Sequence, residues 1–209
     1  MIIEADAPFD DGLVRCNWAC GKSVNQAYRD YHDKEWGVPV HDEQRLFEFI
    51  VLEGAQAGLS WRTVLEKREN YRRAFHGFDI ERVAAMQDSK LETLLSDPGL
   101  IRNRLKIFSA RNNARHALEV IREHGSLDAW IWQFVGGKPI INHWNSQAKV
   151  PATSIVSDTM SKAMHARGFR FIGSTICYAF MQATGMVNDH LLACFCRPGD
   201  LRGSGKVRR

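Results

Sequence analysis

The hydrophobic residues of this chain recur at the spacing of an α-helix, and no segment keeps the period-two alternation that indicates a half-buried β-strand. After Asp42, for example, Leu46, Phe49, Ile50 and Ala57 share one helical face at about 100° per residue. The chain has 209 residues and a hydrophobic content of 44%, which is enough for a well-packed core. We therefore predict an all-α fold.

Capping residues and turns predict where the helices begin and end. Gly58 should end one helix, Ser60 should cap the next, and Pro98-Gly99 should form a sharp turn between two helices. Ser157 and Ser174 should cap two more helices. We expect helices at about Asn25 to His32, Glu43 to Ala57, Trp61 to Phe75, Ile80 to Met86, Leu91 to Leu95, Leu100 to Glu123, 126 to 135, Ser157 to Gly168 and Ser174 to Gly185, a long loop over 136–151, and a last helical segment from about Asn188. Residues 15–198 should form the helical domain, with flexible segments at 1–14 and 199–209.

A carboxylate interrupts the hydrophobic face of the second predicted helix. Glu53 falls at the same helical spacing as the apolar residues, so its side chain should point inward. A buried carboxylate is unfavourable unless a cation or hydrogen-bond donors meet it. One interpretation is a ligand site, because Tyr31, Trp36 and Trp61 are close in sequence, and aromatic rings around an acid suit a flat, cationic guest. The other is an internal ion pair with a buried arginine such as Arg68.

Cysteine and histidine residues near both ends of the chain form a candidate metal site. His190 and Cys194 are four residues apart, which would place them on one face of a helix and within reach of one ion. The N-terminal segment offers Cys16, Cys20 and His32 as further ligands. A site with two thiolates and two imidazoles would hold a structural zinc ion, because four protein ligands leave no open position. Alternatively, the cysteines are small hydrophobic residues of the core.

The sharp turn at Pro98-Gly99 suggests a contact with a phosphate group. A tight turn leaves backbone N–H groups free at the start of the following helix, where the helix dipole favours an anion. Arg102, Arg104 and Lys106 could add positive charge along a nucleic-acid strand. Because any helical hairpin can contain Pro-Gly, this turn alone does not establish nucleic-acid binding.

Charge and hydrophobicity limit the class of protein. The net charge of +4 permits a nucleic-acid partner without requiring one. No apolar run approaches the roughly 18 residues of a membrane span, and the N-terminal residues lack the features of a signal peptide. The five cysteines make an odd number crowded toward the two ends, which is a poor disulfide framework. We expect a cytoplasmic protein with no membrane association.

Several long motifs, in this order, resemble one family: the type I 3-methyladenine DNA glycosylases, which belong to the helix-hairpin-helix glycosylase superfamily. The similarity extends from about Arg15 to Pro198. The motifs are Arg-Cys-x-Trp at 15–18, Tyr-His-Asp-x-Glu-Trp-Gly-Val-Pro at 31–39, Leu-Glu-Gly-x-Gln-Ala-Gly-Leu-Ser-Trp at 52–61, Lys-Arg-Glu-Asn-Tyr at 67–71, Arg-Gly-Phe-x-Phe-x-Gly-x-Thr-Ile-Cys-Tyr at 167–178 and Val-Asn-Asp-His at 187–190.

The resemblance implies a base-excision repair enzyme that flips 3-methyladenine out of alkylated double-stranded DNA and hydrolyses its N-glycosidic bond. Glu53 would be the catalytic residue, and its role could be that of a recognition group, an electrostatic stabiliser of the oxocarbenium-like state or a base. The residues that contact or line the site of the base would be Glu53, Tyr31, Trp61, Trp18 and Trp36. We expect a monomer that releases 3-methyladenine as its product.

The same resemblance implies the metal ligands and the contacts with DNA. A structural zinc ion would be held by Cys16, His32, His190 and Cys194, with Cys20 and Cys196 as rival thiols. A helix-hairpin-helix motif over about 91–108 would contact DNA. Its contact residues would be Pro98, Gly99, Arg102, Arg104 and Lys106. The turn at Gly58-Leu59 is a candidate wedge into the gap that the flipped base leaves.

The sequence departs from the wider superfamily in two places. Superfamily members that also cleave the DNA backbone have a lysine five positions after the hairpin proline, where this chain has Asn103, so we predict a glycosylase with no lyase step. The superfamily's catalytic aspartate has no clear counterpart, since only Glu119, Glu123 and Asp128 are acids nearby. The alternatives are an enzyme that also removes 3-methylguanine or other alkylpurines, and a non-catalytic, zinc-containing helical module that binds damaged DNA.

Overall fold

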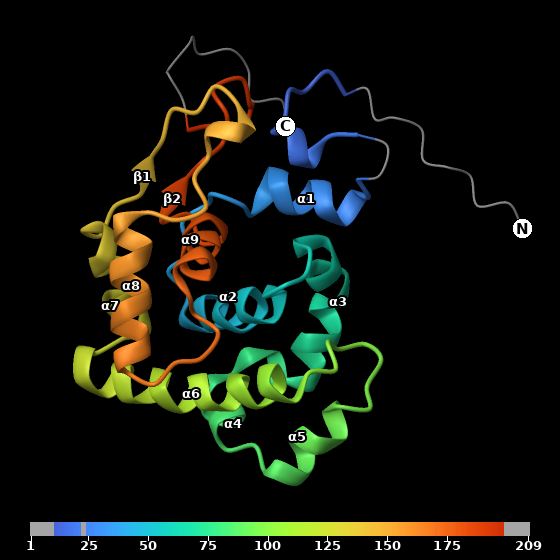
Figure 1. Cartoon of the computed structure of the whole chain (residues 1–209), viewed down its shortest axis with the longest axis vertical. Helices are drawn as coiled ribbons and strands as arrows, with labels where there is room; N and C mark the ends of the chain where they lie inside the picture. Colours follow the sequence, from blue (N-terminus) through green and yellow to red (C-terminus); the bar gives the residue numbers. More distant parts are fainter. Residues whose placement is uncertain (1–10, 22–23, 199–209) are drawn as a thin grey trace, which may run out of the picture.

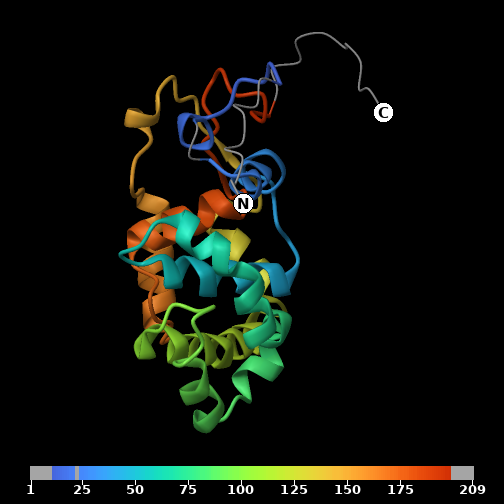
Figure 2. The same ribbon diagram turned by 90° about the vertical axis from the view of Figure 1, so that its right-hand side faces the viewer.

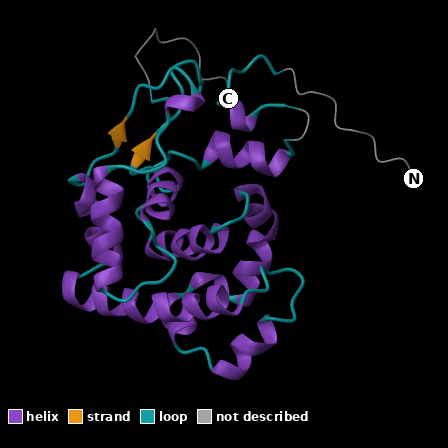
Figure 3. Ribbon diagram, viewed as in Figure 1, coloured by secondary structure: helices purple, strands orange, loops and turns teal. Residues whose placement is uncertain are grey.

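The computed structural model describes residues 11–21 and 24–198. These residues are mostly helical, as predicted (Figure 3). The predicted flexible segments lie outside the described residues, apart from residues 11–14. The α-helices are α1 (Gln26–Lys34), α2 (Glu43–Gln56), α3 (Trp61–Ala74), α4 (Ile80–Ala84), α5 (Asp88–Leu94), α6 (Arg104–His124), α7 (Leu127–Trp132), α8 (Ile155–Ala166) and α9 (Ser174–Ala183). Short 3-10 helices lie at η1 (Asn17–Ala19), η2 (His76–Phe78), η3 (Gln133–Val135) and η4 (Gln147–Lys149).

Two short strands modify the all-α prediction. β1 (Ile140–Ile141) runs parallel to β2 (Val187–Asn188), with Ile140 opposite Val187. β1 lies within the predicted loop at 136–151, and β2 lies where we predicted the last helical segment, so that helix prediction is wrong. Strands of two residues carry no alternating pattern for sequence analysis to detect. None of the helices in the described part of the chain has the length and hydrophobicity that crossing a membrane would need.

Two predicted helix starts are wrong by a few residues. We predicted Ser157 as the cap of α8, but the N-cap is Ser154. The Ser154 hydroxyl accepts a hydrogen bond from Ser157 N, and the Ser157 hydroxyl accepts one from Ser154 N. This reciprocal capping box makes the second serine resemble a cap. α6 begins at Arg104, after the N-cap Asn103, so the apolar residues Leu100 and Ile101 belong to the preceding turn.

Ser174, which we predicted as a cap, is the first residue of α9, whose N-cap is Gly173. The helix starts predicted near Asn25, Glu43 and Ser60 are confirmed. Asn25 and Asp42 cap α1 and α2, and the Ser60 hydroxyl accepts from Thr63 N at 3.2 Å at the start of α3. Gly58, between α2 and α3, has a φ of 76°, a left-handed conformation that favours glycine. The turn therefore reverses the chain and places α2 and α3 side by side.

The second helix, α2, lies in the middle of the fold (Figures 1 and 2). It packs against α3, α6, α7 and α9, and every residue from Leu46 to Ala55 is buried. The helix is therefore buried on all sides rather than along one face. As a result both of its inner acids, Glu48 and Glu53, lie inside the protein.

The two ends of the described chain meet beside α1. The first described segment, 11–21, and the last, 189–198, both lie at the top of Figures 1 and 2. Phe195 N donates a hydrogen bond to Val14 O at 2.9 Å. This contact brings Cys16 close to His190 and Cys194.

Candidate active site and metal centre

A pocket of about 260 Å³ lies between α1, α2, α3 and α9. It brings together all the residues that we predicted around the acid. The lining residues are Trp18, Tyr28, Tyr31, Trp36, Glu53, Gln56, Trp61, Gln147, Ala179 and Gln182. Segments that are far apart in sequence therefore build one cavity, with a single carboxylate among the described residues of its wall.

The carboxyl group of Glu53 is buried without a partner. The residue is 3% exposed, and its Oε2 atom has no hydrogen-bond partner within the described ranges. Burial raises the pKa of Glu53 to about 8. A buried polar atom without a partner is unfavourable unless something else supplies the missing interaction. The pocket therefore offers a free acceptor to a guest.

The buried arginine that could have neutralised Glu53 is engaged elsewhere. Arg68 Nε lies 2.8 Å from Glu48 Oε1, and Arg68 Nη1 lies 2.8 Å from Glu35 Oε2. Arg72 Nε also contacts Glu48 Oε1, at 2.7 Å. Burial would by itself raise the pKa of Glu48, but these two arginines hold it below its ordinary value. The internal ion pair that we considered for Glu53 is thus formed by Glu48 instead.

Aromatic rings surround the free carboxyl group. The rings of Tyr31 and Trp61 have centroids 5.1 Å apart at 45°, and those of Trp18 and Trp36 have centroids 5.1 Å apart at 80°. Trp61 Nε1 is buried and has no acceptor in the described part of the chain. Burial, and then the neighbouring Glu53, raise the pKa of Tyr31 well above its ordinary value. The wall therefore presents flat rings, an indole donor and a hydroxyl group.

Tight backbone contacts hold these rings in place. Trp36 N donates to Tyr31 O at 2.9 Å, and Gly37 N donates to Gln182 O at 2.9 Å. Gly37 has a φ of 77°, and a Cβ atom there would meet Asn188 Nδ2 at 2.9 Å. A glycine is thus needed where the chain passes between the pocket and β2.

Sequence reasoning missed the polar and small residues of the pocket wall: Tyr28, Gln56, Gln147, Ala179 and Gln182. Gln147 is the first residue of η4, within the stretch 136–151 that we predicted as a loop, and Gln182 lies on α9. Neither carries a charge or a spacing that would distinguish it from an ordinary surface residue. Only the tertiary structure brings them to the acid.

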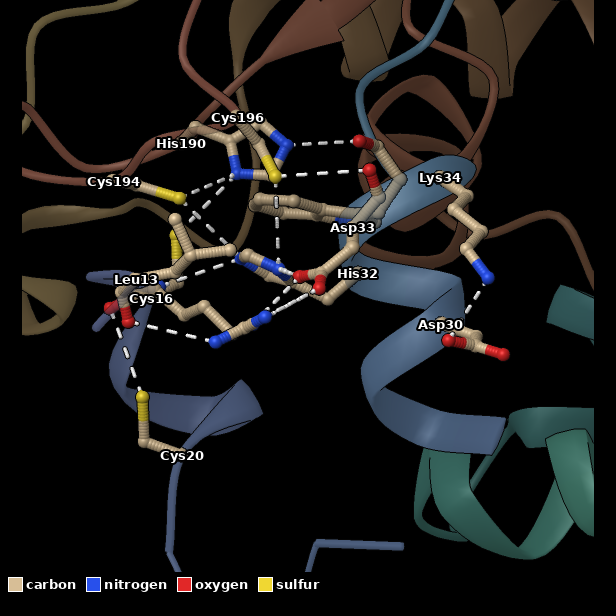
Figure 4. Close-up of polar contacts among 12 residues, drawn as sticks. Leu13, Cys16, Cys20, Asp30, His32, Asp33, Lys34, His190, Cys194 and Cys196 are labelled. Carbon is tan, nitrogen blue, oxygen red and sulfur yellow. Dashed lines mark hydrogen bonds and ion pairs between the residues drawn. The ribbon is translucent and has the colours of Figure 1, made fainter. Parts of the chain in front are cut away.

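Four predicted metal-binding residues lie together. The side chains of Cys16, His32, His190 and Cys194 are buried, and their ligand atoms all lie within 4.8 Å of one another (Figure 4). Cys194 Sγ lies 3.3 Å from His190 Nδ1 and 3.6 Å from His32 Nε2. The outer nitrogens are used elsewhere, with His32 Nδ1 at 2.7 Å from Asp33 Oδ1 and His190 Nε2 at 2.9 Å from Trp36 O. This cluster can bind a metal ion.

The rival thiols have different surroundings. Cys20 is exposed, and its sulfur is directed to Arg15 O at 3.8 Å, away from the cluster (Figure 4). Cys196 Sγ lies 3.9 Å from His32 Nδ1, the nitrogen that faces Asp33 rather than the cluster. The predicted helix through His190 and Cys194 is wrong, because residues 192–193 form a turn and residues 190, 191 and 194 have no regular secondary structure. A bond from Cys194 N to Leu191 O at 2.8 Å nevertheless curls the chain enough to bring the two ligand atoms together.

The turn between α5 and α6 carries the other predicted contact residues. Pro98 O accepts from Lys67 Nζ at 2.7 Å, and Gly99 O accepts from Asn70 Nδ2 at 3.1 Å. A Cβ atom at Gly99 would lie 2.6 Å from Asn70 Nδ2. Arg102 is exposed. The turn is therefore held firmly against α3.

Two of the predicted cations have partners within the protein. Arg104 pairs with Glu92. Lys106 Nζ donates to Ala55 O at 2.9 Å and Ala57 O at 2.5 Å, and burial lowers the pKa of Lys106. Lys106 thereby ties the start of α6 to the turn that carries Leu59, whose side chain is 41% exposed.

The shape of the pocket suits a flat guest with positive charge or hydrogen-bond donors. Aromatic faces can stack on a ring and attract a cation, and a carboxylate in a site of low dielectric constant interacts strongly with such a charge. Among the described residues of the wall there is no lysine or arginine that would compete for Glu53.

Residues 18–197 match the family model described as methyladenine glycosylase. The chain is 48% identical over 188 residues to DNA-3-methyladenine glycosylase 1 of Escherichia coli (strain K12), covering 90% of this chain and 99% of that protein.

Two solved structures are also similar to this chain. A crystal structure of 3-methyladenine DNA glycosylase I superposes with a TM-score of 0.85 at 51% identity, over 88% of this chain and all of the other. A tyrosine-to-phenylalanine variant of 3-methyladenine DNA glycosylase I, in complex with 3-methyladenine, superposes with a TM-score of 0.84 at 30% identity, over 88% of this chain and 98% of that one.

Proposed function

The chain belongs to the methyladenine glycosylase family, and we propose that it excises 3-methyladenine from alkylated double-stranded DNA by hydrolysing the N-glycosidic bond. The observation that carries this proposal is the buried, unpartnered carboxyl group of Glu53 in an aromatic pocket. The names of the similar proteins and the bound 3-methyladenine in one similar structure support the choice of base.

The chemistry of the damaged base explains why such a pocket suffices. Methylation at N3 makes the adenine cationic in DNA, which weakens the glycosidic bond and makes the base a good leaving group. An acid and several aromatic rings attract this cation, whereas a normal adenine lacks the charge. A damaged base also leaves the stack at lower cost. Glu53, Tyr31, Trp61, Trp18 and Trp36 would thus select the flipped base.

Glu53 is also the catalytic residue in this proposal. The other candidate acids are engaged at the surface, since Glu119 contacts His116, Glu123 contacts Arg167 and Asp128 contacts His41. Within the described residues, Glu53 is therefore the acid available to stabilise positive charge as the glycosidic bond breaks. Ionised Glu53 facing the site of bond cleavage would stabilise the oxocarbenium-like transition state.

The reaction should stop after base release. A lyase step needs an amine that attacks the sugar, and the position of the superfamily lysine is occupied by Asn103. Its Oδ1 accepts a hydrogen bond from Lys106 N at 3.1 Å and caps α6. The described residues that line the pocket include no lysine. We therefore propose a monofunctional glycosylase.

We propose that the cysteine and histidine cluster holds a structural zinc ion. Two thiolates and two imidazoles form a donor set that zinc prefers, and the residues that hold it would be Cys16, His32, His190 and Cys194. The contacts of His32 with Asp33 and of His190 with Trp36 O support this choice, because metal-bound imidazoles commonly donate their other N–H group. When bound, the ion would fasten the start of the chain to its end.

The contact with DNA would lie along the turn between α5 and α6. We propose that residues 91–108 act as a helix-hairpin-helix motif. Its backbone at Pro98 and Gly99 would approach a phosphate group, and Arg102, Arg104 and Lys106 would add charge. The exposed side chain of Leu59, next to Gly58, would enter the gap left by the flipped base. The hydrogen bonds of Lys106 to Ala55 O and Ala57 O support a fixed spacing between motif and wedge.

We further propose that the protein acts as a monomer in the cytoplasm. One chain supplies every residue that lines the pocket in the described structure, so no second copy is needed to complete it. All five cysteines are unpaired, which suits a reducing compartment.

The test is release of free base from methylated duplex DNA, resolved by chromatography. The purified protein should release 3-methyladenine, and Glu53→Gln, which keeps the shape of the side chain, should lose this activity while remaining folded. Glu119→Gln is the matched control, because it changes a surface acid. Absence of release by the folded, zinc-loaded protein would indicate a non-catalytic module that binds damaged DNA.

A further inference from the structure

A second buried carboxylate, Asp189, lies next to the pocket wall. It is 1% exposed and is surrounded by hydrogen-bond donors. Its Oδ1 atom accepts from Asn142 Nδ2 and Trp144 Nε1, each at 2.7 Å. Its Oδ2 atom accepts from Tyr178 OH and Gln182 Nε2, also at 2.7 Å each. Four donors on two oxygens fix the carboxylate and every group around it.

This carboxylate determines the orientation of the Gln182 amide. An ionised carboxylate can only accept hydrogen bonds, so the amide atom that faces Asp189 must be the donor Nε2. The carbonyl oxygen Oε1 of Gln182 is then left for other partners. It accepts no hydrogen bond from residues 11–21 or 24–198, and Gln182 lines the same pocket as Glu53. The pocket therefore contains a second, neutral acceptor whose identity is fixed.

The other glutamines of the wall lack such a constraint. The side-chain amides of Gln56 and Gln147 form no hydrogen bonds with the described residues, so each can turn either its donor or its acceptor toward a guest. Gln182 cannot turn without placing its carbonyl oxygen against Asp189. A fixed acceptor can discriminate between donors and acceptors on a base, whereas a free amide accommodates both.

Purines differ in whether the group at position 6 can donate a hydrogen bond to a fixed acceptor. Adenine carries an amino group there, which donates, whereas guanine and hypoxanthine carry a carbonyl oxygen, which accepts. An acceptor that meets a carbonyl oxygen leaves two buried groups unpaired, and this penalty exceeds the value of the lost hydrogen bond alone.

We propose that Gln182 selects 6-amino over 6-oxo purines, by accepting a hydrogen bond from the exocyclic amino group of 3-methyladenine through Oε1. Asp189 is the positioning residue that fixes this orientation. The inference rests on the proposed glycosylase function and deepens it, because it gives a reason for 3-methylguanine to be a poor substrate. Glu53 attracts the cation in either base, and Gln182 distinguishes the two.

The test compares two damaged bases in one DNA sample. Duplex DNA that contains both 3-methyladenine and 3-methylguanine is incubated with excess protein, and the single-turnover release rates are measured by chromatography. Gln182→Met keeps the length of the side chain and removes the acceptor. It should lower the ratio of the 3-methyladenine release rate to the 3-methylguanine release rate by about tenfold, mainly through slower release of 3-methyladenine. Gln44→Met, which removes an amide that contacts Gly77 O at the surface, should keep the wild-type ratio.

A binding measurement gives a second readout that does not depend on catalysis. The heavy atoms of free 3-methyladenine and 3-methylhypoxanthine differ only at position 6, and the affinities of both bases are measured by calorimetry. In Asp189→Asn the new amide can donate, so Gln182 can reverse and present Nε2. The preference for 3-methyladenine should then fall, and the affinity for 3-methylhypoxanthine should rise.

The outcomes separate this inference from the function on which it rests. If the wild-type protein releases neither base, the proposed function fails. If it releases 3-methyladenine but folded Gln182→Met keeps the wild-type rate and affinity ratios, or slows both bases equally, the role of Gln182 is overturned and the function stands. Melting temperatures of the variants establish that each is folded.

Discussion

The backbone oxygen of Trp36 orients the imidazole of His190. A carbonyl oxygen only accepts, so His190 Nε2 must donate to it across 2.9 Å. His190 Nδ1 is thereby left facing Cys194 Sγ at 3.3 Å and Cys16 Sγ at 3.6 Å. The indole of the same tryptophan lines the pocket. Trp36 therefore connects the cysteine and histidine cluster to the pocket, and a substitution at either site should also alter the other.

The ionisation of Glu53 should govern the pH dependence of base excision. Burial raises its pKa to about 8, so near neutral pH most of the free protein carries the protonated acid. Because the proposed role needs the carboxylate, kcat/KM on alkylated duplex DNA should rise as pH increases through about 8 and then level off. Rates measured at low DNA concentration over a pH series check this. A flat profile from about pH 6 to about pH 9 would contradict it.

Protein stability should change with pH in the opposite direction. The folded state holds the Glu53 proton more tightly than the unfolded state does. The stabilisation linked to this proton is complete below the ordinary pKa of 4.5 and is lost as pH rises through about 8. Above that pH, Glu53→Gln should be more stable than the parent by roughly 2–5 kcal/mol. Urea denaturation of both proteins at several pH values measures the difference, which should vanish at acid pH.

Removal of one thiol of the cluster should lower metal content and stability rather than act directly on base excision. Cys194→Ser should lose most of its zinc and lower the melting temperature, because structural zinc contributes directly to folding free energy. Metal analysis of the purified variant checks this, with Cys20→Ser as the matched control that should keep its zinc. A full equivalent of zinc in Cys194→Ser would remove Cys194 from the ligand set. Loss of zinc in Cys196→Ser would add the rival thiol to it.

A change in the turn at Gly99 should weaken binding to DNA and leave binding of the free base unchanged. Gly99→Pro removes the N–H group that donates to Asp97 Oδ1 at 2.7 Å and adds atoms where Asn70 Nδ2 is already close. Affinity for duplex DNA should fall by about tenfold, while affinity for free 3-methyladenine stays unchanged. Fluorescence anisotropy and calorimetry measure the two. Gly173→Ala, where a Cβ atom meets nothing within 4 Å, is the control. Equal losses in both measurements would show that the turn supports the whole fold.

Much of the helical framework could be predicted because local chemistry determines it. Three helices are capped by side chains that bind free N–H groups of their own first turn: Asn25, Asp42 and Ser60. Residues close together in sequence are therefore enough to predict where these helices begin. The errors arose where two residues offered the same chemistry, as with Ser154 and Ser157. Val187 and Asn188 form a strand with Ile140 and Ile141, and Ile140 lies 47 residues before Val187, which is too far for any local sequence pattern to indicate the pairing.

The candidate site could be predicted only in part for the same reason. The inward direction of Glu53 follows from helical spacing, but the choice of Arg68 as partner of Glu48 depends on how α2 and α3 are packed. Nothing in the sequence distinguishes the two acids of α2. Similarly, Gln182 becomes informative only once Asp189 is seen to hold its amide.

The cysteine and histidine cluster joins residue 16 to residue 194, with its other members at 32 and 190. During synthesis the chain emerges from its N-terminus, and its early segments can begin to fold before the later ones exist. This cluster cannot form in that way. Cys16 and His32 must wait until residue 194 has left the ribosome, and a product that ends before residue 194 lacks one of the four ligands. Metal binding would therefore be restricted to chains that extend past residue 194, and shorter products would lack this link between distant segments and be more open to proteolysis.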